Sequence, residues 1–231
     1  MSGFDYIKKN IDEIRKEIYV INKNVKLLGV TKTFSKEAVE AAIQFGLNEF
    51  GESKIQEAET KIAGIKSSYS GILWHFIGHL QGNKVRKVVE NFDVIESCDS
   101  AALMEKISAV SLEAGKIIQC LLEIKVSPEG TKSGILPEDA ATVIDGVKYF
   151  KGIKVAGIMA MAPYSDNPEN ARPYFKRARK LFDDIKSSNP GGNVSMDILS
   201  MGMSGDYKAA MEEGSTQVRI GTAIFGRRNY I

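Results

Sequence analysis

Residues 196–222 read MDILSMGMSGDYKAAMEEGSTQVRIGT, and this stretch contains the unit from which we expect the fold to be built. A short apolar run at 196–200 is followed by a turn of small residues, a helical pattern at 206–213 and a second apolar run at 217–220. Short apolar runs that alternate with amphipathic stretches are typical of βα units in a parallel sheet.

The same alternation extends back along the chain to residue 26. Eight runs predict strands, at residues 26–30, 49–50 with their neighbours, 73–77, 94–96, 117–126, 154–159, 196–200 and 217–220. Helical patterns fill most of the intervals, at residues 36–45, 54–65, 84–91, 101–114, 137–149, 170–187 and 206–213. Eight units fit a closed TIM (β/α)8 barrel better than an open sheet, which more often has about five or six strands.

An apolar stripe precedes the first unit and recurs every three or four residues, as one face of a helix does. Its members are Phe4, Ile7, Ile11, Ile14 and Ile18. We therefore expect an extra N-terminal helix that packs against the barrel. The length of 231 residues is within the range of one such barrel, so the expected organisation is a single α/β domain over residues 1–231.

The composition is typical of a soluble globular protein, with 43% hydrophobic and 26% charged residues and a net charge of +2. Basic residues are scattered and not gathered in the patch that nucleic-acid binders usually show. Cys98 and Cys120 lie in or beside expected strands without metal-site spacing, so we expect buried, reduced thiols. The N-terminal segment lacks the apolar core of a signal peptide and no run reaches membrane-spanning length, which predicts a cytoplasmic protein.

Lys32 directly follows the first apolar run, and active sites of α/β barrels lie at the C-terminal ends of their strands. Its side chain could therefore point into the barrel mouth, where loss of solvent lowers the pKa of an amine and makes it a nucleophile towards an aldehyde. The alternative is a strand-end lysine in solvent. Position alone does not distinguish the two.

Two loops near the C-terminus suit an anion. Small and hydroxyl residues at 199–205 follow the seventh strand, where Ser204 is placed as a helix cap or as a phosphate ligand. Gly221 and Thr222 follow the eighth strand, and Arg219 within that strand is costly unless it is paired or faces a ligand. The loops after strands seven and eight are the recurrent phosphate position of this fold, so we expect a phosphate-bearing ligand. A Gly-rich turn with a cap is the alternative.

The only two histidines are His75 and His79. Their spacing suits two metal ligands on a helix, but along a strand it separates the side chains by about 13 Å. We therefore expect no metal site, with His79 near the ligand at a strand end and His75 in the core. Glu49 and Glu52 could form an acid–base pair, but nothing else in the sequence supports glycoside chemistry.

Several longer motifs stand out, namely LGVTKTF (28–34), FGESKIQE (50–57), HFIGHLQGNK (75–84), TKSG (131–134), GIMAM (157–161) and LSMGMSGDYKAAMEEGSTQVRIGTAIFG (199–226). Together they resemble the YggS/PROSC family, the pyridoxal 5'-phosphate (PLP) homeostasis proteins, over nearly the full length. Two departures occur. Ser53 and Lys54 stand where the family commonly has Asn-Tyr, and Thr31 stands where it has Ser.

The resemblance implies an alanine-racemase-like barrel that holds PLP as an aldimine on Lys32. The residues that it implies for cofactor binding are Lys32, His79, Ser200, Met203, Ser204, Arg219, Gly221 and Thr222. Among these, Ser204, Gly221 and Thr222 would hold the phosphate with help from Ser200, and Arg219 would face the pyridine nitrogen. A cation there opposes protonation of the nitrogen and weakens the ring as an electron sink.

We therefore expect a monomeric PLP carrier that serves PLP homeostasis and PLP-dependent apo-enzymes without catalytic turnover. One alternative is an amino-acid racemase, which needs a second acid–base group on the opposite ring face, with Lys132 and His79 as the candidates. Alanine racemases add a second domain with a catalytic tyrosine, for which we expect no room here. Another alternative is a barrel enzyme without PLP, in which Lys32 forms a Schiff base with a sugar phosphate.

Overall fold

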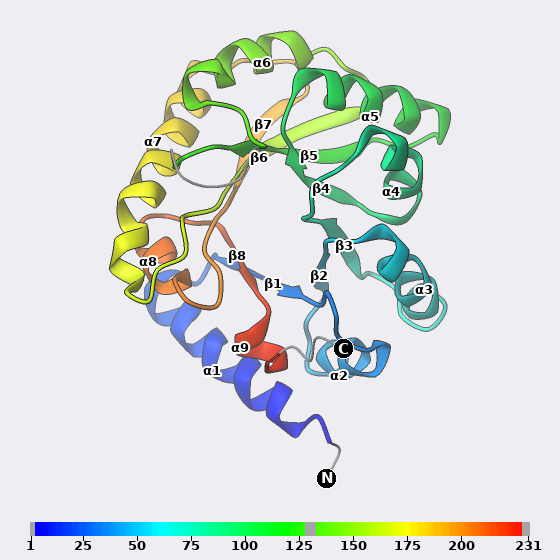
Figure 1. Cartoon of the computed structure of the whole chain (residues 1–231), viewed down its shortest axis with the longest axis vertical. Coiled ribbons are helices and arrows are strands. Elements are labelled where there is room, and N and C mark those ends of the chain that lie inside the picture. The colour runs from blue at the N-terminus through cyan, green and yellow to red at the C-terminus, as the bar shows by residue number, and fades with distance from the viewer. Residues whose placement is uncertain (1–2, 128–132, 228–231) are drawn as a thin grey trace.

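The computed structural model describes residues 3–127 and 133–227, and within them eight parallel strands close into a barrel in the order β1 to β8 (Figure 1). The strands are β1 Lys26–Val30, β2 Glu49–Glu52, β3 Leu73–Phe76, β4 Val94–Cys98, β5 Ile118–Ile124, β6 Ile153–Ala160, β7 Val194–Ser200 and β8 Gln217–Ile220. The barrel closes where β1 pairs with β8, with Lys26 opposite Gln217 and Gly29 opposite Ile220. The closed barrel predicted from the eight apolar runs is confirmed.

Helices surround the barrel on the outside (Figure 1). The described α-helices are α1 Asp5–Asn22, α2 Lys36–Gln44, α3 Ile55–Lys66, α4 Val85–Asn91, α5 Ala101–Glu113, α6 Ala140–Val147, α7 Arg172–Ser188, α8 Tyr207–Glu212 and α9 Thr222–Phe225. Short 3-10 helices precede three of them, η1 Gly82–Lys84, η2 Pro137–Asp139 and η3 Pro168–Ala171. Because helices cover the outer face of every strand, most strand residues are buried on both faces, which is why the strands read as apolar runs.

Helix α1 lies along α8 and α9, as Figure 1 shows. The predicted apolar stripe is buried at Ile7, Ile11, Ile14 and Ile18. The amide of Asn10 also donates to the carbonyl oxygen of Ile224 at 2.9 Å. The predicted N-terminal packing helix is thus confirmed.

The structure differs from the sequence reading at some element ends. Strand β4 continues to Cys98 with all five residues buried, and the helix expected from residue 137 begins with a 3-10 turn. The four-residue helix α9 was not anticipated, because it is too short to show a helical period. Cys98 and Cys120 are both buried and free of disulfide bonds. Across residues 3–127 and 133–227, none of the helices has the length and apolarity to cross a membrane.

Candidate functional site

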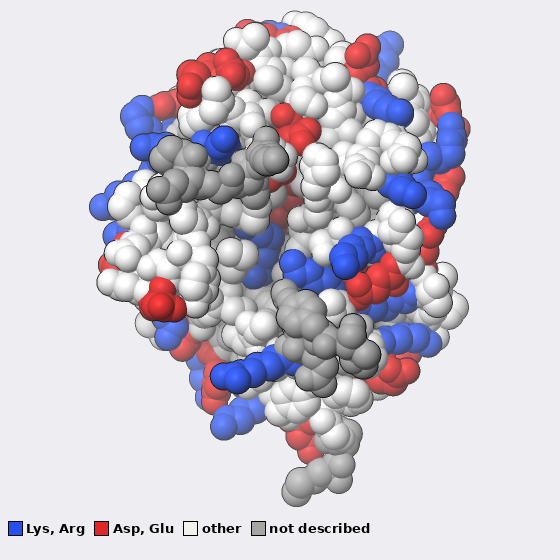
Figure 2. Space-filling view, viewed as in Figure 1, with Lys and Arg blue, Asp and Glu red and all other residues white. Residues whose placement is uncertain are grey.

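A cavity of about 370 Å³ lies where the loops after β1, β7 and β8 meet. Six of the eight residues expected to bind a cofactor line it, namely Lys32, Met203, Ser204, Arg219, Gly221 and Thr222. Figure 2 shows lysine and arginine atoms in the hollow of the face in view, while charges of both signs are scattered over its coloured surface. The fold therefore brings together Lys32 and Thr222, which are 190 positions apart in the chain.

The cavity lining combines apolar walls with a few polar groups. Val30, Ile77, Met159 and Met161 supply apolar surface. The polar groups are the amine of Lys32, the guanidinium of Arg219, four hydroxyl groups, the carboxyl group of Asp206 and the backbone of the glycine-containing loops. Such a donor set suits a flat aromatic ligand that carries an aldehyde and an anionic group, because the ring packs on apolar walls while cations and hydroxyls bind the polar ends.

Ser204 connects the two loops that were expected to bind phosphate. Its hydroxyl oxygen accepts hydrogen bonds from the backbone N–H groups of Gly221 and Ala223, both at 3.3 Å. Nearby, the N–H of Met203 donates to a carboxylate oxygen of Asp206 at 2.6 Å, and burial raises the pKa of that carboxyl group. The loop after β7 and the loop after β8 are thereby held as one surface of the cavity.

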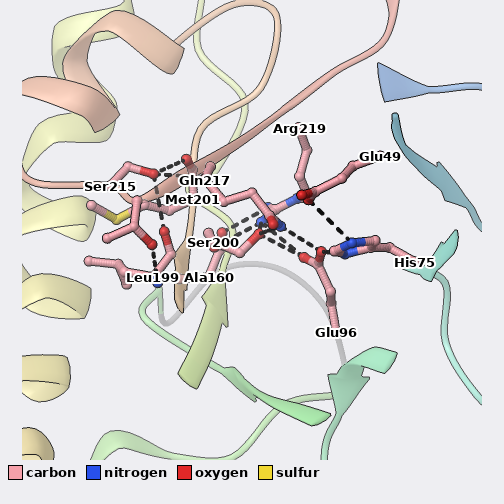
Figure 3. Close-up of polar contacts among 11 residues, drawn as sticks. Glu49, His75, Glu96, Ala160, Leu199, Ser200, Met201, Ser215, Gln217 and Arg219 are labelled. Carbon is pink, nitrogen blue, oxygen red and sulfur yellow. Dashed lines mark hydrogen bonds and ion pairs between the residues drawn. The ribbon is translucent and has the colours of Figure 1, made fainter. Parts of the chain in front are cut away.

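Arg219 reaches the cavity from β8 with its guanidinium fixed by the barrel interior (Figure 3). One terminal nitrogen donates to the backbone oxygen of Ser200 at 2.8 Å and to its hydroxyl at 2.7 Å, and the other donates to the carbonyl of Ala160 at 3.0 Å. A carboxylate oxygen of Glu96 lies 3.8 Å from the guanidinium. Burial lowers the pKa of Arg219 from its ordinary value, but a guanidinium titrates so far above neutrality that it stays charged.

Glu96 is fully buried and is the centre of a polar network inside the barrel (Figure 3). Its carboxylate accepts hydrogen bonds at 2.7 Å from each of His75 Nδ1, the Ser200 hydroxyl and the Gln217 amide. Burial by itself raises the pKa of Glu96, but the hydrogen bond from His75 and the charges of His75 and Arg219 outweigh it and lower the pKa. The network therefore keeps an anion beneath the cation of Arg219.

Sequence reasoning did not find this network, although it placed His75 correctly in the core. Its members come from β3, β4, β7 and β8, with Glu49 of β2 at 3.5 Å from His75 Nε2. A signal was present, because Glu96 and Gln217 are polar residues inside apolar strand runs. Which polar residues face one another depends on barrel closure, and the sequence does not give that register.

Two expected cofactor residues lie elsewhere. Ser200 is fully buried, and its hydroxyl is engaged by Glu96 and Arg219, so it contacts the arginine and not the phosphate loops. His79 is exposed, with Nδ1 3.5 Å from Asp99, and does not line the cavity. Lys132, the other racemase candidate, lies outside the described residues. Within residues 3–127 and 133–227, no group of three or more His, Cys, Asp or Glu is placed to hold a metal ion.

Glu123 of β5 provides a test of the electrostatics at the barrel mouth. Its side chain is only 5% exposed. Burial, together with the charge of Asp99, raises its pKa. A raised pKa means that the folded state disfavours the ionised form, so the wild type loses stability as the pH rises through this pKa.

We expect Glu123→Gln to increase the free energy of unfolding at pH 8 by on the order of 1 kcal/mol, because a neutral amide replaces a buried anion. The gain should vanish at a pH below the ordinary pKa of glutamate, where both chains are neutral at this position. Urea unfolding at the two pH values measures the difference. A gain of equal size at both pH values would show that packing and not charge is responsible.

Comparisons with known proteins point to a single family. A family model described as alanine racemase, N-terminal domain, matches residues 4–229. The pyridoxal phosphate homeostasis protein of Synechocystis sp. is 40% identical over 211 residues, covering 91% of this chain and 95% of the relative. The protein of the same name from Haemophilus influenzae is 38% identical over 228 residues, covering 99% of this chain and 95% of the relative.

Solved structures agree with these matches. PipY of Synechococcus elongatus, solved without PLP and with PLP bound, superposes with TM-scores of 0.88 and 0.86 at 32% and 31% identity. Each match covers 95% of this chain and 100% of PipY. An alanine racemase of Clostridium difficile superposes with a TM-score of 0.76 at 14% identity, covering 98% of this chain and 57% of the racemase. At that identity the likeness shows the shared barrel alone.

Proposed function

Because the chain belongs to the alanine racemase N-terminal domain family, and within it to the pyridoxal phosphate homeostasis proteins, we propose that it holds PLP in the barrel mouth and keeps it available to apo-enzymes. The observation that carries the proposal is the convergence of Lys32, Arg219 and the Ser204 loop on one cavity. PLP bound in the related PipY supports the same ligand. We further propose that the protein acts as a cytoplasmic monomer without a nucleic-acid or membrane partner.

The functional groups that line the cavity match the aldehyde and the phosphate of PLP. Bound PLP would supply an aldehyde, with which an unprotonated lysine amine condenses with loss of one water molecule. Lys32 is the lysine that lines the described cavity, and it provides that amine. The hydroxyl groups of Ser204 and Thr222 would donate to a phosphate at the loops after β7 and β8, and the backbone N–H of Gly221 donates to the Ser204 oxygen and holds that hydroxyl in place.

Arg219 favours binding of PLP over catalysis of a reaction on an amino-acid substrate. Its cation is fixed by Ser200 and by the backbone of Ala160, and it lines the same cavity as Lys32. A fixed cation beside a pyridine nitrogen opposes protonation of that nitrogen, so carbanion formation on a bound substrate gains little from the ring. We therefore propose that the chain retains and releases the cofactor and does not catalyse amino-acid chemistry.

One experiment separates the carrier from a racemase and from a barrel enzyme without PLP. The purified protein is titrated with PLP, its visible absorbance is recorded, and the complex is tested for α-proton exchange on amino acids and for transfer of PLP to an apo-enzyme. We expect a coloured complex, transfer and negligible exchange. Rapid exchange would instead support the racemase, and failure to bind PLP would reject both PLP functions.

A further inference from the structure

The turn that carries Lys32 is held by a buried group of charges on its outer side. Lys61 of α3 is only 7% exposed, although a lysine is rarely buried. Its ammonium donates to the carbonyl oxygen of Thr31 at 2.8 Å and to a carboxylate oxygen of Glu52 at 2.7 Å. The peptide group that precedes Lys32 is therefore bound directly by a buried cation.

Glu52, at the end of β2, binds the same turn through a side chain. It is fully buried, and the oxygen that faces Lys61 also accepts from the hydroxyl of Thr31 at 2.8 Å. Burial raises the pKa of Glu52, while the charge and the hydrogen bonds of Lys61 and Thr31 act against that rise. Its other carboxylate oxygen has no hydrogen-bond partner among the described residues.

Glu57 holds the other side of the turn. Its carboxylate accepts a hydrogen bond from the backbone N–H of Thr33, and the same oxygen lies 3.6 Å from the ammonium of Lys61. We call Glu52, Glu57 and Lys61 the Lys61 cluster. The cluster thus binds the two peptide groups on either side of Lys32, the earlier one by a cation and the later one by an anion.

The turn needs such support because its backbone is strained. Thr33 has a φ of 71°, in the left-handed region that a β-branched residue rarely adopts. Strained backbone persists where its surroundings over-determine it, and such residues gather at functional sites. A buried ion pair adds little net stability on average, so an explanation by stability alone does not account for the cluster.

We infer that the Lys61 cluster positions Lys32, fixing the turn so that its amine approaches an aldehyde held in the cavity. This inference rests on the proposed function, and it assigns a positioning role to three residues that do not line the cavity. Ligands that lack the aldehyde should therefore be insensitive to the cluster. Ligands that engage Lys32 should depend on it.

The test compares PLP with pyridoxine 5'-phosphate, which has a hydroxymethyl group in place of the aldehyde. Glu57→Ala is the main variant, because Glu57 is one-third exposed and its removal leaves the core intact. We expect about a tenfold loss of PLP affinity, the size of one charge-assisted hydrogen bond, and no more than about a twofold change for pyridoxine 5'-phosphate. Glu57→Gln should restore PLP affinity, because its amide oxygen can accept from Thr33.

Two further variants complete the design. Glu59 lies in the same helix as Glu57, and its carboxylate pairs with Lys87 at 3.0 Å. The variant Glu59→Ala removes that carboxylate and should bind both ligands as the wild type does. Lys61→Met removes the buried cation. Its loss of PLP affinity should be larger than that of Glu57→Ala, while its affinity for pyridoxine 5'-phosphate should change little. If Lys61→Met does not fold, Glu57→Ala decides the outcome alone.

The inference is overturned if Glu57→Ala binds PLP as the wild type does, or if it loses both ligands equally. A wild type that binds neither PLP nor pyridoxine 5'-phosphate would instead reject the proposed function. The two failures are thus distinguishable within one set of titrations.

Discussion

Lys32→Ala is expected to remove the visible absorbance of the PLP complex and to weaken PLP binding about 100-fold, or about 2.7 kcal/mol. Without the amine no covalent bond to the aldehyde forms, and only the phosphate donors, the apolar walls and Arg219 remain. Pyridoxine 5'-phosphate should bind the variant nearly as well as the wild type. Absorbance and calorimetric titration with both ligands measure the change.

Lys36→Ala provides the matched control. Lys36 lies four positions further along and pairs with Glu40 at 3.3 Å on the surface of α2. Its removal should leave absorbance and affinity unchanged. If Lys32→Ala kept the wild-type absorbance, another amine would have to hold the cofactor, and the assignment of Lys32 would fail.

Gly157→Ala is expected to lower the free energy of unfolding by about 3 kcal/mol or more. A Cβ at this position of β6 would lie 1.8 Å from the carbonyl oxygen of Ile198 in β7, and the glycine has a φ of 158°. Neighbouring backbone cannot move aside as a flexible side chain can. The strands would therefore have to separate where β6 and β7 pair at this position.

Gly146→Ala tests whether the loss at Gly157 is specific. Gly146 lies in α6, and a Cβ there meets no atom within 4 Å. Alanine in a helix is more favourable than glycine by up to about 1 kcal/mol, so this variant should be as stable as the wild type or more stable. Equal destabilisation of the two variants in urea unfolding would contradict the clash at β6.

The elements of the fold followed from local pattern. Parallel strands covered by helices are buried on both faces, so runs such as residues 26–30 and 217–220 were recognisable without any knowledge of their neighbours. The four-residue helix α9 was missed because a helical period needs more residues than that. Element ends such as Cys98 were less certain, since local signals fix boundaries poorly.

The site was predictable only in part. Lys32 and the loops at Ser204 and Gly221 follow strand ends, and the fold places such positions at one mouth whatever their distance in sequence. Polar groups buried by tertiary contacts could not be found in this way. Lys61 lies in an amphipathic helix, where a lysine is normally read as solvent-facing, and Glu96 gave no sign that it would meet Ser200 across the barrel.

The two buried polar groups support the same mouth from different sides. The Glu96 network fixes Arg219 from the barrel interior, and the Lys61 cluster fixes the Lys32 turn from the helix layer. Neither group of residues needs to touch the ligand to affect its binding. The chain therefore has a lysine and an arginine that are both held in place around one cavity, as a protein that retains a reactive aldehyde requires.

Lys32 is proposed to be the residue that holds PLP, and reductive trapping tests that assignment most directly. The PLP complex is treated with borohydride, which makes the lysine attachment permanent, and the digested protein is examined by mass spectrometry. We predict one pyridoxyl phosphate group, on the peptide that contains Lys32. A label spread over surface lysines, or no label at Lys32 in a protein saturated with PLP, would contradict the claim.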